Sequence, residues 1–193
     1  MLIAPHLQAG LNLIELIIAI AIISMLMAMG VPAFNLWIQN SQTRTAAESI
    51  LNGMQIARQE AVRRNTSVRF NLTDATGGVA WSVDCVTVTA NCPSGIQTRG
   101  SSEGGSNARA GIGTSTGTLG TGLAAGTGLP AGVTFDGFGR VPSVNIGTDV
   151  SRVDITNAAN ANARRMVILV SPGGQTRMCD PAVPLASNPQ GCS

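Results

Sequence analysis

An apolar run near the N-terminus constrains this chain more than any other feature. Residues 11–30 are almost all apolar or small, and the polar exceptions are Asn12, Glu15 and Ser24. A helix of about 20 apolar residues spans the hydrocarbon core of a bilayer. The sequence of 193 residues therefore predicts one transmembrane helix followed by one domain of ordinary size.

Glu15 is the one acidic residue in this run. A carboxylate forced toward the bilayer centre is costly, so an acid within a membrane helix is by default a functional-site hypothesis. The alternative is that Glu15 lies at the headgroup level and caps the helix N-terminus, where the helix dipole favours an anion. The residue by itself leaves both interpretations open.

The order of residues around Glu15 adds a resemblance. A short polar leader ends in Gly10, Glu15 is the fifth residue after it, and Pro32 closes the apolar run. This arrangement resembles the N-terminal signal of type IV pilins and type II secretion pseudopilins. The resemblance implies that a prepilin peptidase removes residues 1–10 by cutting between Gly10 and Leu11, and methylates the new N-terminus. It also implies that Glu15 pairs with the N-terminal amine of a neighbouring subunit during assembly.

The leader departs from that pattern in two ways. The family usually has a bulky aromatic residue after the glycine, where this chain has Leu11, and residues 1–10 hold no Lys or Arg. Basic residues on the cytoplasmic side normally set the orientation of a membrane helix. The natural start is therefore expected either at Met1 or upstream of it.

Helical patterning continues after the apolar run. Gly30 and Pro32 are expected to bend the helix, because proline removes a backbone hydrogen bond. In residues 33–65 one apolar face recurs at spacings of three and four, and opposite charges stand four residues apart. The face comprises Ala47, Ile50, Leu51, Met54, Ala57 and Ala61, and the charge pairs are Arg44 with Glu48 and Glu60 with Arg64.

Residues 57–65, ARQEAVRRN, give a second resemblance. They are similar to a stretch of pseudopilin H of type II secretion and of the FimT/FimU minor pilins, which together form the GspH/FimT family. This resemblance implies an α+β, pilin-like fold, in which one long N-terminal helix packs on an antiparallel β-rich head. Residues 11–32 are then the transmembrane and assembly helix, residues 33–65 its amphipathic continuation, and residues 66–193 the head.

Within residues 66–193 the period of the apolar residues changes to two. This alternation predicts a β-hairpin over residues 68–72 and 79–83, with Trp81 in the core. Residues 165–170 are nearly all apolar after two arginines, which predicts a central strand buried on both faces. Further short strands are predicted at residues 133–135, 140–141, 144–146, 152–155 and 175–178.

Residues 99–132 are rich in small residues and include eleven glycines. A stretch of this composition lacks the apolar density that would offset its ordering entropy. We therefore expect a mobile, glycine-rich surface insertion at about residues 99–132.

Four cysteines, Cys85, Cys92, Cys179 and Cys192, all follow the apolar run. An even number of cysteines in an exported domain indicates disulfides in an oxidising compartment. Three connectivities exist, and we favour the sequence-local pairs Cys85–Cys92 and Cys179–Cys192. A zinc site is the alternative, but the chain has no CxxC pair and its single histidine lies in the leader.

The composition argues against an enzyme. Without its leader the chain has no His, Lys or Tyr, and the aspartates stand mostly in turn sequences, where they accept local backbone hydrogen bonds. The formal net charge of +2 gives no strong electrostatic reason to expect nucleic acid or acidic lipid as a partner. We therefore expect no catalytic site, no metal and no cofactor.

The C-terminal residues carry a third resemblance. FimT/FimU proteins commonly have the motif GRxR before a Cys-Asp pair, and in DNA-uptake members its two arginines contact DNA phosphates. Residues 174–177 of this chain read GQTR, so Gln175 replaces the first arginine. Loss of one cation weakens the binding of phosphates. Arg177, with Arg164 and Arg165, remains as a candidate DNA contact.

These patterns predict a minor pilin that primes or tips assembly of a type IV pilus, in pilus biogenesis and twitching motility. The disulfide-closed C-terminal loop favours this reading. Pseudopilin H of the type II secretion system and a DNA-binding minor pilin for natural transformation are the alternatives. The expected partners are other pilin or pseudopilin subunits, the prepilin peptidase and the inner-membrane assembly platform. The expected location is the bacterial inner membrane, crossed once, with a periplasmic head that later joins a pilus or pseudopilus.

Overall fold

The structure, a computed structural model, describes residues 12–103 and 105–192. Within these residues it has one α-helix, eight strands and one short 3-10 helix. The helices are α1 (Leu13–Arg64) and η1 (Ser143–Asn145). The strands are β1 (Val68–Leu72), β2 (Trp81–Cys85), β3 (Gln97–Arg99), β4 (Ala108–Gly113), β5 (Ala131–Phe135), β6 (Arg152–Asn157), β7 (Met166–Val170) and β8 (Thr176–Cys179).

The chain has two parts, which meet between Trp37 and Ile38. The first part holds the apolar portion of α1, whose large side chains are exposed. Its most apolar window of 18 residues has a mean hydropathy of 2.5, so this helix is long and apolar enough to cross a membrane. The helix runs without interruption through Gly30 and Pro32, and the bend expected there stays a prediction. The predicted cleavage site at Gly10 and Leu11 lies outside the described residues.

The second part, from Ile38 onward, is the head. There one face of α1 is buried against the sheets, as its apolar spacing predicts, while Leu51 is half-buried. Gly53 allows the closest approach, because a Cβ at this position would lie 2.7 Å from the ring of Phe70 and 3.1 Å from that of Trp81. The buried residues of this face are Thr43, Ala46, Ala47, Ser49, Ile50, Gly53, Met54, Ala57 and Ala61.

The predicted ion pairs on α1 are present in the head. Arg44 Nε lies 2.8 Å from Glu48 Oε1, and Arg64 Nε lies 2.7 Å from Glu60 Oε2. Arg63 also donates to Glu60, and this hydrogen bond is the main cause that holds the pKa of the Glu60 carboxyl below its usual value.

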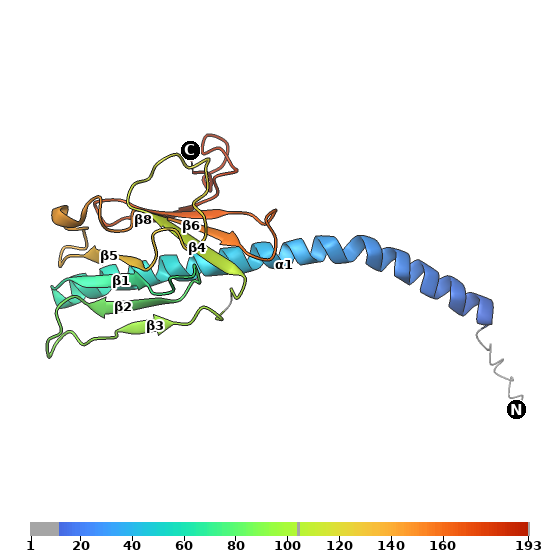
Figure 1. The fold of residues 1–193 in the computed structure, drawn as a ribbon, viewed down its shortest axis with the longest axis horizontal. Coiled ribbons are helices and arrows are strands. Elements are labelled where there is room, and N and C mark those ends of the chain that lie inside the picture. The colour runs from blue at the N-terminus through green and yellow to red at the C-terminus, as the bar shows by residue number, and fades with distance from the viewer. Residues whose placement is uncertain (1–11, 104, 193) are drawn as a thin grey trace, which may run out of the picture. The chain divides into compact units, whose positions relative to one another are not determined.

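Two four-stranded sheets pack on this helix, as Figure 1 shows for the head. The order is β3-β2-β1-β5 in the first sheet and β4-β6-β7-β8 in the second, and every pair of neighbouring strands is antiparallel. Side chains from both sheets and from α1 form one core. This arrangement confirms the predicted α+β fold of one long helix on an antiparallel β-rich head.

The hairpin and the central strand agree with the sequence pattern. β1 and β2 pair from Val68 with Cys85 to Leu72 with Trp81, and Trp81 is buried. β7 lies between β6 and β8. Its Ile168 packs into the main core, while Val167 is buried in a separate cluster with the Cys179 and Cys192 sulfurs. Both faces of β7 are therefore covered.

Two short predicted strands are wrong. At residues 140–141 the chain closes a turn, in which Asp136 N donates to Arg140 O at 2.8 Å. The residues predicted as a strand at 144–146 instead overlap η1, and the side chains of Val144 and Ile146 are exposed. Apolar alternation stabilises a strand only when a partner strand and a buried face exist, and this segment has neither.

The prediction of one mobile insertion at residues 99–132 is also wrong. β4 lies within this range, is largely buried, and pairs with β6 along its whole length, while β5 begins at Ala131. The small residues allow close packing: a Cβ on Gly111 would clash with the carbonyl oxygen of Ala124. Glycine here permits contact between backbones, so its abundance does not indicate disorder.

Candidate functional site

The predicted assembly residue Glu15 lies in the first part of the chain. It is in the first turn of α1, its backbone N–H donates to Asn12 O at 3.0 Å, and its side chain is exposed. The next turns present only apolar side chains up to Ser24, whose hydroxyl donates to Ile20 O at 2.7 Å within the same helix. Glu15 is therefore the one charged group on an exposed apolar helix surface.

An aromatic pair marks the end of the apolar run. Phe34 and Trp37 are both exposed, and their rings stack with centroids 5.9 Å apart. Phe and Trp one turn apart on a helix lie on the same side, so the pair forms one exposed aromatic patch. Sequence reasoning missed this pair, although its i, i+3 spacing directly after the apolar run was visible.

All four cysteines of the head form disulfides. Cys85 bonds to Cys92 and Cys179 to Cys192, with Cα–Cα distances of 5.8 and 5.0 Å. These are the two sequence-local pairs. Since each sulfur is in a disulfide, none of them is available as a zinc ligand.

Arg165, a candidate DNA contact, is used inside the head. Its Nη1 lies 2.5 Å from Asp154 Oδ2, and its Nη2 donates to the carbonyl oxygen of Leu119 at 2.6 Å. The Asp154 side chain is fully buried, and that of Arg165 is 17% exposed. The guanidinium therefore stabilises the fold, which argues against Arg165 as a contact for DNA.

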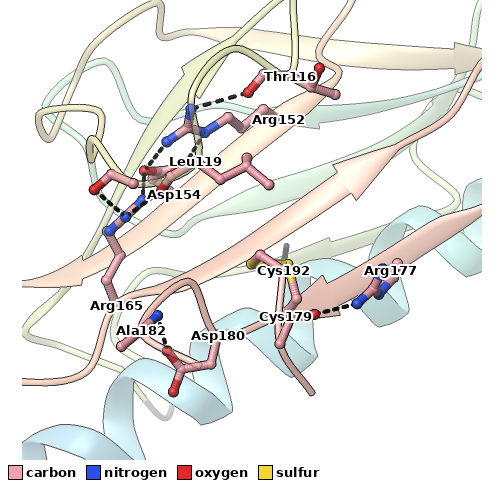
Figure 2. Close-up of a disulfide and its surroundings, with 12 residues drawn as sticks. Thr116, Leu119, Arg152, Asp154, Arg165, Arg177, Cys179, Asp180, Ala182 and Cys192 are labelled. Carbon is pink, nitrogen blue, oxygen red and sulfur yellow. Dashed lines mark hydrogen bonds and ion pairs between the residues drawn. A yellow bond between two sulfur atoms is a disulfide. The ribbon is translucent and has the colours of Figure 1, made fainter. Parts of the chain in front are cut away.

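Arg152 completes this arrangement, which we call the arginine cluster: Arg152, Asp154 and Arg165 (Figure 2). Arg152 Nε donates to Asp154 Oδ1 at 2.6 Å, and its Nη atoms donate to carbonyl oxygens of the loop at residues 114–123. The backbone N–H of Leu123 also donates to Asp154, at 2.9 Å. The cluster thus ties the loop to the outer face of the second sheet. Sequence reasoning placed Arg152 and Asp154 in the predicted strand at residues 152–155 but did not pair them, although an Arg and an Asp two apart in a strand lie on one face.

Arg164 and Arg177 have other partners. Arg164 is exposed and its Nη1 lies 3.8 Å from Asp180 Oδ2. Arg177 is on β8 and its Nη2 donates to the carbonyl oxygen of Gly191. Figure 2 shows Arg165 and Arg177 on opposite sides of the Cys179–Cys192 disulfide. The three arginines are therefore not gathered into one phosphate-binding surface.

An open groove of about 860 Å³ lies in the head between α1 and β8. Its walls carry cations and amides, and within the part of the chain that the structure describes no carboxylate lines it. The residues that line it are Gln55, Arg58, Gln59, Val62 and Arg63 on α1, with Gln175, Thr176 and Arg177 at β8.

A long helix with an exposed apolar N-terminal part, packed in the head on two antiparallel sheets, defines a pilin-like protein. Residues 46–174 match the sequence model of the family described as type II transport protein GspH. This match covers more than half of the chain, so the protein belongs to the GspH family, and the predicted resemblance is confirmed. The GspH family is a family of pilin-like structural proteins, and this chain is one of its members.

A solved structure shows the same fold. A crystal structure of the type IV minor pilin FimU of Pseudomonas aeruginosa in space group P21 is 18% identical, covers 78% of this chain and 94% of its own, and has a TM-score of 0.50. A second FimU structure, in space group P65, is 19% identical, covers 78% of this chain and 99% of its own, and has a TM-score of 0.47. No curated protein sequence matches this chain.

Proposed function

We propose that this protein is a minor pilin that primes or tips assembly of a type IV pilus, and so acts in pilus biogenesis and twitching motility. The observation that carries the proposal is the exposed apolar portion of α1 with Glu15 in its first turn. An apolar helix surface of this size needs either lipid or the helices of other subunits to cover it. A filament subunit uses both, first in the membrane and then in the filament.

In this proposal the chain is a single-pass protein of the bacterial inner membrane with its head in the periplasm. The prepilin peptidase cuts between Gly10 and Leu11 and methylates the new N-terminus, and the inner-membrane assembly platform then moves the subunit into the filament. The two disulfides suit an oxidising periplasm. We assign no catalytic role to any residue.

The Cys179–Cys192 loop favours a pilus over a pseudopilus, since a disulfide-closed C-terminus is typical of pilins. Its hydrogen bonds give it a defined conformation: Asp180 N donates to Gln190 O at 2.7 Å, and Ala182 N donates to Asp180 Oδ1 at 2.9 Å. Pseudopilin H of the type II secretion system is the second candidate, supported by the GspH family match.

The proposed membrane anchor predicts how deeply Trp37 lies in the lipid bilayer. Trp and Phe side chains favour the interface between lipid and water, and the Phe34–Trp37 pair stands where the apolar run ends. In vesicles, the fluorescence of Trp37 in the Trp81→Phe variant is expected to be quenched more by lipids brominated near the carbonyl groups than by lipids brominated near the chain ends. The Trp37→Phe variant is the control, because buried Trp81 is expected to be insensitive to either lipid. Equal or absent quenching of Trp37 would contradict an interfacial position.

Deletion of the gene, with complementation by the intact gene, separates the two candidate functions. The proposal predicts loss of surface pili and of twitching motility, while secretion of exported enzymes stays normal. Loss of secretion with pili intact would identify the protein as a pseudopilin instead.

A further inference from the structure

The groove between α1 and β8 has the features of a binding site for an extended polypeptide. β8 is the outer strand of its sheet, since its only neighbour within the described residues is β7. Ser171 N donates to Gln175 O at 2.9 Å, which makes these residues a hydrogen-bonded pair at the start of the β7–β8 ladder. In an antiparallel ladder such pairs alternate. Arg177 then faces β7 with its backbone groups, and the N–H and C=O groups of Thr176 and Met178 face the open edge.

Just beyond β8, this open edge already pairs with another segment of the same chain. Asp180 continues the outward-facing set, and it forms a parallel bridge with Gly191, with its N–H donating to Gln190 O at 2.7 Å. The segment that continues β8 thus accepts a backbone partner at Asp180, and the groove lies along residues 175–177 of the same segment. Open strand edges of this kind recruit further strands.

The side chains of the groove define the charge of the occupant. Arg58 donates from Nε to Gly139 O at 3.0 Å, and Arg177 donates from Nη2 to Gly191 O, so each keeps further N–H groups for a ligand. Arg63 pairs with Glu60, but its side chain is 66% exposed, and such a pair exchanges readily. Three guanidinium groups without a lining carboxylate favour an acidic ligand. The amides of Gln55, Gln59 and Gln175 add donors and acceptors of the kind that a peptide backbone satisfies.

We propose that this groove binds an acidic, extended segment of a partner protein, which pairs through its backbone with the open edge of β8 and places carboxylates on Arg58, Arg63 and Arg177. The strand edge favours a polypeptide over a nucleic acid, because only a polypeptide offers the matching ladder of N–H and C=O groups. This binding does not depend on whether the protein joins a pilus or a pseudopilus.

The test uses the full chain in detergent micelles and fluorescence anisotropy. The probe is a fluorescein-labelled peptide of alternating Glu and Val, and a matched peptide with Lys in place of Glu is the control. The acidic peptide is expected to bind, to bind more weakly as salt is raised, and to bind at least about tenfold more tightly than the Lys peptide. Arg58→Gln and Arg177→Gln are each expected to weaken binding about tenfold. Arg44→Gln, on α1 but outside the groove, is expected to leave it unchanged.

The backbone pairing is tested at Thr176. Thr176→Pro removes the outward N–H, whereas Thr176→Val keeps it, so only the proline variant is expected to lose binding. A thermal unfolding curve establishes that each variant is folded, and the Arg58 variant tests the groove without changing β8. Equal affinity for the acidic and Lys peptides would overturn the proposal. So would tighter binding of a single-stranded oligonucleotide that the same arginine variants abolish.

Discussion

Replacing Glu15 by Ala or Gln is expected to reduce the amount of subunit in filaments at least about tenfold, while the protein still accumulates in the membrane. A lone carboxylate in a packed bundle of apolar helices is unfavourable, but a carboxylate paired with an ammonium group is tolerated, and loss of one member of a buried pair is strongly destabilising. If Glu15 pairs with the N-terminal amine of a neighbour, its removal leaves that amine unpaired. The measurement is an immunoblot of sheared filaments and membranes from the same cells.

Ser24→Ala is the matched control for this experiment. Ser24 is the next polar residue along the exposed apolar part of α1, but its hydroxyl already donates to Ile20 O within the helix. We therefore expect the Ser24→Ala subunit to enter filaments normally. Wild-type levels of Glu15→Gln in filaments would contradict the pairing of Glu15 with an amine, since a neutral amide cannot supply the charge.

In the head, the features that the sequence predicted correctly are those that depend on residues close together in the chain. The buried face of α1 follows from apolar spacing, and the β1–β2 hairpin from alternation around a turn. Both depend on residues close together in the chain, so local periodicity predicts them. The strand at 144–146 failed because its apolar residues have no partner strand, which is a property of the whole fold.

In the glycine-rich segment, residues 99–132, the sequence predicted disorder where the structure is ordered. Composition alone makes residues 99–132 resemble a disordered linker, but Ala108 and Ala110 are fully buried and Gly111 sits against the backbone of Ala124. The loop that follows β4 is ordered by Arg152, Asp154 and Arg165. Arg152 donates to Thr116 O, although these two residues are more than thirty positions apart in the chain. No local pattern reports a contact at that separation, so the loop and its cluster could not be predicted together.

Asp154→Ala is expected to be the most destabilising single substitution in the head, by roughly 3–5 kcal/mol. Asp154 is fully buried, the side chain of Arg152 is 4% exposed, and both carboxylate oxygens accept charged donors. Removing the carboxylate leaves two guanidinium groups without their counter-charge in a site that excludes water. The measurement is urea unfolding, in micelles, of the full chain carrying Trp37→Phe, followed by the fluorescence of buried Trp81.

Two comparisons separate this cause from a general loss of packing. Asp136→Asn changes an aspartate in an exposed turn, whose Oδ1 accepts from the N–H groups of Phe138 and Arg140, and an amide oxygen can replace it, so a loss below about 1 kcal/mol is expected. Arg152→Met combined with Asp154→Leu removes both charges of the more deeply buried pair, and is expected to recover part of the loss caused by Asp154→Ala. Because the cluster holds carbonyl oxygens of residues 114–123, limited proteolysis of Asp154→Ala is expected to cut first in this loop. A loss under 1 kcal/mol in Asp154→Ala, with the loop still resistant, would mean that the close packing of β4 and β6 orders the segment without the cluster.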